Sequence, residues 1–134
     1  MITINGTALA DMGVILLRGA YAELMAPVET KNYVENDDPT KHGVEIDTLI
    51  SPKLKKRDVT LSFFVKGTSE GDFISKYNGF LEVLYSGYIE LVVPDLGACF
   101  RLIYRANTKY ANYRLNACEV AVKFTEPDPT NRAL

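Results

Sequence analysis

Few residues of this chain could do chemistry that needs a nucleophile, a metal ligand or an imidazole. Two cysteines, Cys99 and Cys118, and one histidine, His42, supply all of its thiol and imidazole groups. A closed zinc site takes four such ligands at paired spacings, so three scattered residues do not predict one. The sequence also has no glycine-rich phosphate loop and no nucleophile elbow. It therefore predicts no cofactor and no metal site, and it favours a protein that is not an enzyme.

His42 would have to serve any catalytic triad, but it lies in a polar stretch, residues 38–43, with no nucleophile motif nearby. We interpret it as a solvated loop histidine. Cys118 falls at an apolar position of an expected strand, where a buried thiol packs like a small hydrophobic group. Cys99 lies beside a turn, and the two thiols could pair across a hairpin. Without an export signal, we expect both to be reduced.

Charge gathers in two short segments. Residues 35–38 are acidic through Glu35, Asp37 and Asp38, and residues 53–57 are basic through Lys53, Lys55, Lys56 and Arg57. The simplest interpretation of the basic segment is a solvated strand edge whose lysines prevent unwanted pairing. A second is a contact with the acidic segment of a neighbouring subunit, which would steer assembly. Contact with a nucleic-acid backbone ranks last, because the chain has 15 basic and 17 acidic residues.

Aromatic side chains could also make an interface. The chain has eight tyrosines and no tryptophan, and Tyr104, Tyr110 and Tyr113 fall within one expected hairpin. Exposed tyrosines there would suit a protein interface, or they could pack on the sheet with their hydroxyls in water. Phe64 falls on the face of its strand opposite to the apolar residues around it. That second face could therefore also be covered near the end of the strand.

The elements that must position these residues are mostly strands. Polar and apolar residues alternate over 58–65 and again over 117–124, so Val59, Leu61, Phe63 and Val65 should point inward, as should Cys118, Val120, Val122 and Phe124. Further strands are expected over 14–17, 88–93 and 100–105. Asn5-Gly6 predicts the turn of an N-terminal hairpin.

Between these strands the period changes to that of an α-helix. One helical face would hold the apolar residues Phe73, Ile74, Tyr77, Phe80, Leu81 and Leu84. Ser69 is a suitable N-cap with Asp72 three residues further on, and Gly87 suits the C-terminal cap. The pattern predicts a helix over about 70–86.

No period is found from Tyr21 to Gly43, so we expect a long loop over about 22–43, followed by a short strand over 44–49. A loop of this length inside a compact domain is commonly functional. With 134 residues, 47% apolar and 24% charged, the chain fits one domain, 1–134. No apolar stretch approaches the ~18 residues of a membrane span, so no membrane association is expected. The predicted fold is mainly β (α+β), a split β-barrel or β-sandwich with one flanking helix.

Residues 53–126 resemble the N-terminal domain of phage distal tail proteins and the related tail tube proteins. The resemblance depends on Lys56-Arg57-Asp58-Val59-Thr60-Leu61-Ser62-Phe63, on Gly67 with the helix, on Gly87-Tyr88-Ile89-Glu90-Leu91, and on Phe100-Arg101-Leu102-Ile103-Tyr104. The opening Ile2-Thr3-Ile4-Asn5-Gly6 also matches the way such chains begin. The match is one of pattern, without a catalytic motif.

This resemblance implies subunits that associate into a ring, commonly a hexamer, around a channel of the tail. Neighbours join their sheets, which would here involve the edges around 58–65 and 116–124, and a long loop, here 22–57, reaches a neighbour. Distal tail proteins often add a C-terminal domain of galectin-like shape. The sequence stops at Leu134 without one, which favours a ring-forming hub or tube subunit over a carbohydrate reader.

The hypothesis from the sequence is therefore a structural virion subunit of a phage or prophage tail, made in the bacterial cytoplasm, that acts by self-assembly. Its partners would be itself and other tail proteins, with nucleic acid only passing through the channel. The candidate interface residues are Glu35, Asp37, Asp38, Lys53, Lys55, Lys56, Arg57, Phe64, Tyr110 and Tyr113. The alternative is a small β-sandwich module that binds a carbohydrate or a peptide.

Overall fold

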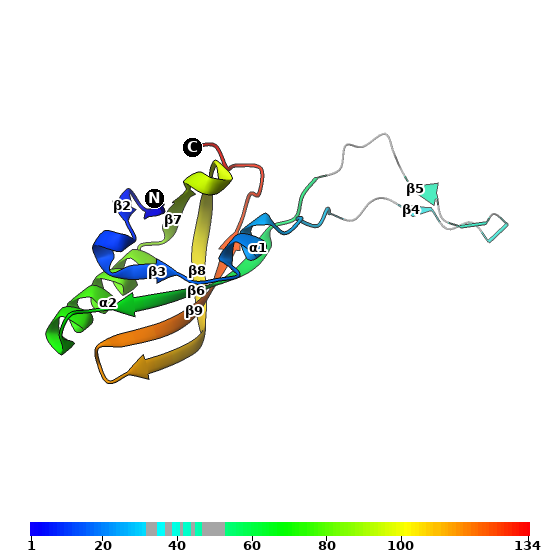
Figure 1. The fold of residues 1–134 in the computed structure, drawn as a ribbon. Helices are drawn as coiled ribbons and strands as arrows, with labels where there is room; N and C mark the ends of the chain where they lie inside the picture. The colour runs from blue at the N-terminus through cyan, green and yellow to red at the C-terminus, as the bar shows by residue number, and fades with distance from the viewer. Residues whose placement is uncertain (32–34, 37–38, 41, 44, 47–52) are drawn as a thin grey trace.

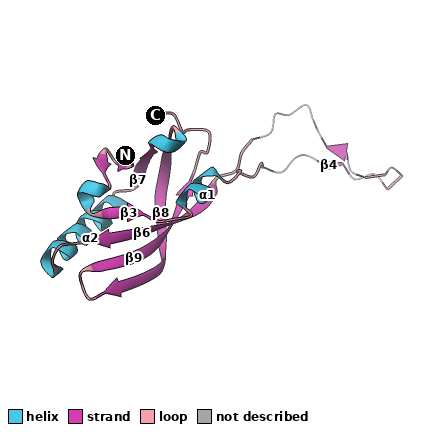
Figure 2. Cartoon of the chain, in the orientation of Figure 1, coloured by secondary structure: helices cyan, strands magenta, loops and turns pink. Residues whose placement is uncertain are grey.

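A computed structural model describes residues 1–31, 35–36, 39–40, 42–43, 45–46 and 53–134. Within them, seven strands form one antiparallel sheet in the order β2-β1-β7-β8-β9-β6-β3. These strands are β1 (Thr3–Ile4), β2 (Thr7–Ala8), β3 (Val14–Leu16), β6 (Arg57–Lys66), β7 (Tyr88–Val93), β8 (Ala98–Tyr113) and β9 (Ala117–Glu126). The sheet curls into a half-barrel (Figure 2), which confirms the mainly β prediction.

The long helix α2 (Glu70–Leu84) packs on the concave side of the sheet (Figure 1). The Ser69 hydroxyl accepts from the N–H of Asp72 at 3.1 Å, which confirms the predicted N-cap. Asp72 in turn accepts from the N–H of Thr68 at 2.8 Å, one residue before the position it takes in a standard capping box. Short 3₁₀ helices, η1 (Ala10–Met12) and η2 (Pro94–Leu96), complete the turns.

The core lies between α2 and the inward faces of β6 and β9, where the alternating residues predicted to point inward are all buried. At its centre, the ring of Phe63 lies 5.1 Å from that of Phe80 and 6.3 Å from that of Phe124. The turn between β6 and α2 passes very close to the helix. A Cβ atom at Gly67 would lie only 2.3 Å from the backbone nitrogen of Phe73, which is a steric clash. Glycine is therefore required there.

Ile74 departs from the predicted helix face. Its side chain is 45% exposed, whereas Phe73, Phe80 and Leu84 are buried. Ile74 lies at the margin of the apolar stripe of this helix.

The predicted loop over 22–43 is partly wrong. Helix α1 (Ala20–Met25) occupies the first residues of this range, and its Ala20 and Leu24 are buried. It packs on the seven-stranded sheet, which together with α2 we call the body. Six residues are too few to show a helical period, which explains why the sequence pattern missed it. Further along, β4 (Glu35–Asn36) pairs antiparallel with β5 (Glu45–Ile46). The rest of the strand expected over 44–49 lies outside the described residues.

The expected free edge around 116–124 is wrong, because β9 pairs with β6 on one side and with β8 on the other. β9 is therefore internal to the sheet. β6 differs, because β3 pairs with its outer side only at residues 63–65. Residues 58–62 of β6 have no strand partner on that side within the part of the chain that the structure describes.

Candidate functional site

The most prominent feature outside the body is an arm within residues 27–56, whose described parts lie away from the sheet on the side of α1 (Figure 1). Its two roots, residues 27–31 and 53–56, pair with each other as antiparallel backbone. The N–H of Lys31 donates to the carbonyl of Lys53 at 2.7 Å, and that of Lys55 donates to the carbonyl of Glu29 at 2.8 Å. Thr30 and Leu54 form a bridge between these bonds. The arm therefore begins as a two-stranded ribbon.

Arg57, the first residue of β6, anchors this ribbon to the body. Its guanidinium donates to the backbone carbonyls of Glu23 (3.2 Å), Leu24 (2.9 Å) and Ala26 (3.1 Å) at the end of α1. The last carbonyls of a helix have no partner within it, and a cation there also suits the helix dipole. Its Nε donates to Glu126 at 2.8 Å. One side chain thus fixes both the segment that enters the arm and the segment that leaves it.

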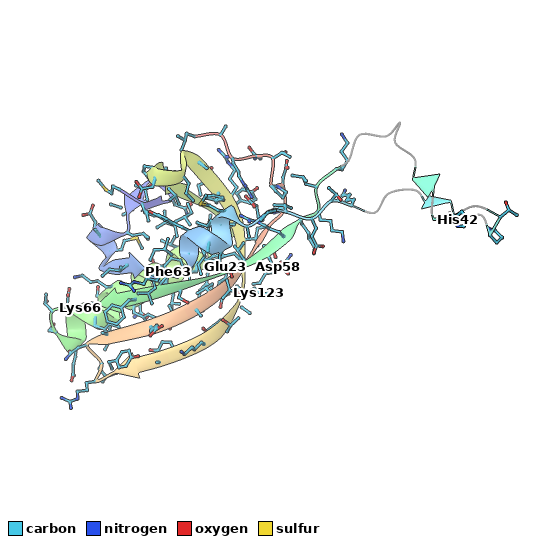
Figure 3. All side chains as sticks on the ribbon, turned by 45° about the vertical axis from the view of Figure 1, so that its right-hand side comes forward. Glu23, His42, Asp58, Phe63, Lys66 and Lys123 are labelled. Atoms are coloured by element: carbon cyan, nitrogen blue, oxygen red, sulfur yellow. The ribbon has the colours of Figure 1, made fainter. Side chains whose placement is uncertain are left out.

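A hollow of about 320 Å³ lies at the arm roots. It is lined by Glu23, Ala26, Pro27, Val28, Glu29, Lys56, Arg57, Asp58 and Val59. The Thr125 hydroxyl donates to Asp58 at 2.7 Å, and Lys123 lies 3.6 Å from its other oxygen (Figure 3). This hydrogen bond, aided by Lys123, lowers the pKa of Asp58. A carboxyl group that stays ionised is a poor general acid, so Asp58 does not suit that role.

The second feature is an open stretch of sheet edge. β7 pairs with β8 only as far as Ile103, while β8 continues to Tyr113 with β9 as its one strand neighbour within the described residues. Such an edge presents unpaired backbone groups that can pair with another strand. Two register shifts with β9, at 104–106 and 107–109, bend this stretch. We call residues 104–113 the open edge.

Tyrosines lie along the open edge on both faces of the sheet. Tyr110 is 43% exposed, and its ring lies 5.9 Å from that of Tyr77 on α2. Tyr113 is 50% exposed, and lies on the opposite face, 6.4 Å from Phe64. Each ring thus contacts one neighbouring ring and keeps part of its surface exposed, and a protein interface at these tyrosines stays a prediction. Tyr104 is more covered and packs edge-on against Tyr85.

The candidate interface residues are spread over these features. Lys53, Lys55 and Lys56 lie on the arm root, and Glu35 lies in β4 further along the arm. Asp37 and Asp38 lie outside the described residues. The guanidinium of Arg57 is taken up by contacts within the chain, which leaves it little capacity for a neighbour.

Sequence reasoning missed Glu126, which accepts from Arg57, and Arg132, which donates to Glu126. No signal could have found them, because a lone glutamate before a proline predicts the end of a strand and says nothing of burial.

The residues that could do chemistry are dispersed. His42 is exposed near the far end of the arm, as predicted (Figure 3). Both cysteines are free and buried, and burial raises the pKa of the Cys99 and Cys118 thiols, which makes them poor nucleophiles. Among the described residues, no group of three His, Cys, Asp or Glu side chains is placed to hold a metal ion. In the same part of the chain, no helix has the length and apolar character needed to cross a membrane.

Comparison with known proteins gives a likeness of fold. No protein-family model matches the chain, and neither does any curated protein. Among solved structures, the fold is similar to that of the SPP1 Dit (gp 19.1) protein, described as a paradigm of the hub adsorption apparatus in Gram-positive infecting phages, with a TM-score of 0.64 and 15% identity. The match covers 96% of this chain and 51% of Dit, so the chain spans about half the length of that protein. At this identity, the likeness establishes the fold.

Proposed function

We propose that this protein is a structural subunit of a phage or prophage tail, a distal hub or tail tube ring, which acts by self-assembly and not by catalysis. The observation that carries the proposal is the likeness of nearly the whole chain to the Dit fold. The dispersal of the chemically capable side chains supports a structural role. In the virion tail, its partners would be its own copies and other tail proteins.

The arm and the open edge supply the two halves of a head-to-tail contact. Among the arm residues whose burial the structure describes, none is buried. A neighbour that covered it would offset the entropy lost on ordering it. Because the arm and the open edge are different surfaces, contact between them is heterologous, and such contacts generate rings when the rotation closes.

The acidic and basic segments would set the polarity of this contact. Lys53 and Lys56 are exposed at the arm root, and the acidic segment lies further along the same arm. Opposite charges on neighbouring copies speed encounter and suppress wrong registers more than they add affinity. Assembly that depends on them should weaken as salt is raised.

The experiment is to replace residues 32–52 with an Asn-Gly turn, which closes the root ribbon as a hairpin and keeps Arg57 in place. We expect a folded sheet by circular dichroism and loss of assembled species in light scattering and negative-stain images. The matched control is the full chain with Ser62→Thr, a small change on β6 outside the arm and the open edge. A full chain that stays monomeric up to millimolar protein, also in the presence of preformed tail structures, would contradict the proposal. Glycan or peptide binding by such a monomer would instead favour a binding module.

A further inference from the structure

The C-terminal tail, residues 127–134, lies back on the body alongside the start of β8. The N–H of Cys99 donates to the carbonyl of Arg132 at 3.1 Å. The guanidinium of Arg101 donates to the carbonyls of Asn131 (3.1 Å) and Ala133 (3.0 Å). The tail is therefore docked by its backbone, at a place separate from the arm.

Arg132 also reaches inward from this tail. Its guanidinium lies over the ring of Phe100, 5.0 Å from the centroid, and makes two hydrogen bonds to Glu126. Nε donates to Oε2 at 2.9 Å and Nη2 donates to Oε1 at 2.7 Å. This paired geometry is the strong form of an arginine–carboxylate contact, and it fixes the orientation of the carboxylate.

Glu126 is the point where the tail and the arm meet. Its side chain is 0% exposed, and its Oε1 also accepts from Arg57 Nε at 2.8 Å. A buried carboxylate is stabilised only by its ion-pair and hydrogen-bond partners. Removing one partner leaves a buried charge that is not fully compensated. The two arginines are therefore energetically coupled through one carboxylate, although they contact different segments.

We propose that the tail controls the arm through this carboxylate. Arg132 holds Glu126 in place, Glu126 orients Arg57, and Arg57 holds the end of α1 and the start of β6, from which the two arm roots depart. Separating Arg132 from Glu126 therefore loosens the roots, and a partner that takes up the tail together with Arg132 releases the arm. The link lies within one chain, so it stands or falls independently of the proposed assembly.

The test is hydrogen exchange in the full-length monomer, measured for single amides by NMR. The N–H groups of Lys31 and Lys55 report on the roots, because each bonds across the ribbon. In Arg132→Ala we expect both to exchange at least about tenfold faster, since a buried ion pair loses a partner and the opening is local. The amides of the β6–β9 ladder should keep their wild-type rates.

Arg101→Ala is the matched control, because it removes the contacts of Arg101 with Asn131 and Ala133 and keeps the Arg132–Glu126 pair. Its root amides should exchange as in the wild type. In the Arg57→Ala background, adding Arg132→Ala should not increase the exchange rates of the root amides further, because the two residues act through the same carboxylate.

Unchanged root amides in Arg132→Ala would overturn the proposal. Equal acceleration in Arg101→Ala would also overturn it, because the roots would then loosen while the Arg132–Glu126 pair is kept. If Arg132→Ala loosens the whole sheet, Arg132→Lys decides the matter, since lysine keeps the charge and loses the paired geometry. In Arg132→Lys, faster exchange confined to the root amides supports the proposal. Root amides that exchange at the wild-type rate overturn it.

Discussion

The body and the arm of this protein are held in place by different physics. In the body, apolar side chains from α2, β6 and β9 interlock around Phe63 and exclude water. In the arm, no residue whose burial is described is buried, and its roots are held by backbone bonds and by Arg57. Stability of the body is therefore distributed over many contacts. The position of the arm depends on a few polar ones.

The largest effect should come from the centre of the body. Phe63→Ala removes a fully buried ring between Phe80 and Phe124, and should cost about 4 kcal/mol, from lost burial and from the cavity left behind. Urea unfolding followed by circular dichroism measures this. A loss below ~1 kcal/mol would mean that the core is not organised around this ring.

Arg57→Ala should rank second, at about 3 kcal/mol, because it leaves a buried carboxylate short of one partner and the end of α1 without its donor. The side chain is only 10% exposed, so water screens the pair little. The same urea titration applies. Arg105→Ala is the control, since that arginine bonds to Thr125 and does not touch Glu126. A cost no larger than that of the control would show that Arg57 does not anchor the body.

Ser69→Ala should cost about 1 kcal/mol, through the lost N-cap of α2. Thermal unfolding detects this loss of stability. Ser69→Asp should keep most of the wild-type stability, because aspartate is an equally good N-cap. No rescue by aspartate would mean that the cap hydrogen bond is not the cause.

Lys55→Ala should have the smallest effect, within about 0.5 kcal/mol, because its ion pair with Glu29 at 3.6 Å is exposed to solvent. The change in the free energy of unfolding that Lys55→Ala causes should be nearly the same in low and in high salt. If this variant destabilised the body as strongly as Arg57→Ala, the arm root would be part of the core, and body and arm would not be held by different interactions.

The sequence predicts the body well because burial there is periodic. Alternation over β6 and β9 identifies their inward residues, and the helical spacing with Ser69 locates α2. It predicts the anchor poorly. The contacts of Arg57 join residues 69 positions apart, and they depend on how α1, β6 and β9 come together. Arg57 was identified within a charged segment, but nothing in its neighbourhood distinguishes it from the exposed Lys56 beside it.

The open edge shows a similar limit. The hairpin of β8 and β9 is visible in the sequence, but the point where β7 stops covering β8 is set by the unequal lengths of three strands. Tyr110 and Tyr113 were open to two interpretations because the sequence shows neither which strand borders them nor on which face each ring lies.

Closure of the arm at its roots has an evolutionary consequence. The hydrogen bonds between residues 29–31 and 53–55 fix the spacing of the two chain segments. The fold of the body therefore does not depend on the length or sequence of the arm beyond these bonds. Lengthening such an excursion costs little, because loop-closure entropy grows only with the logarithm of length, about 0.6 kcal/mol for each doubling. The arm can thus be resized, exchanged between variants or fitted with a grafted epitope while the half-barrel is inherited unchanged.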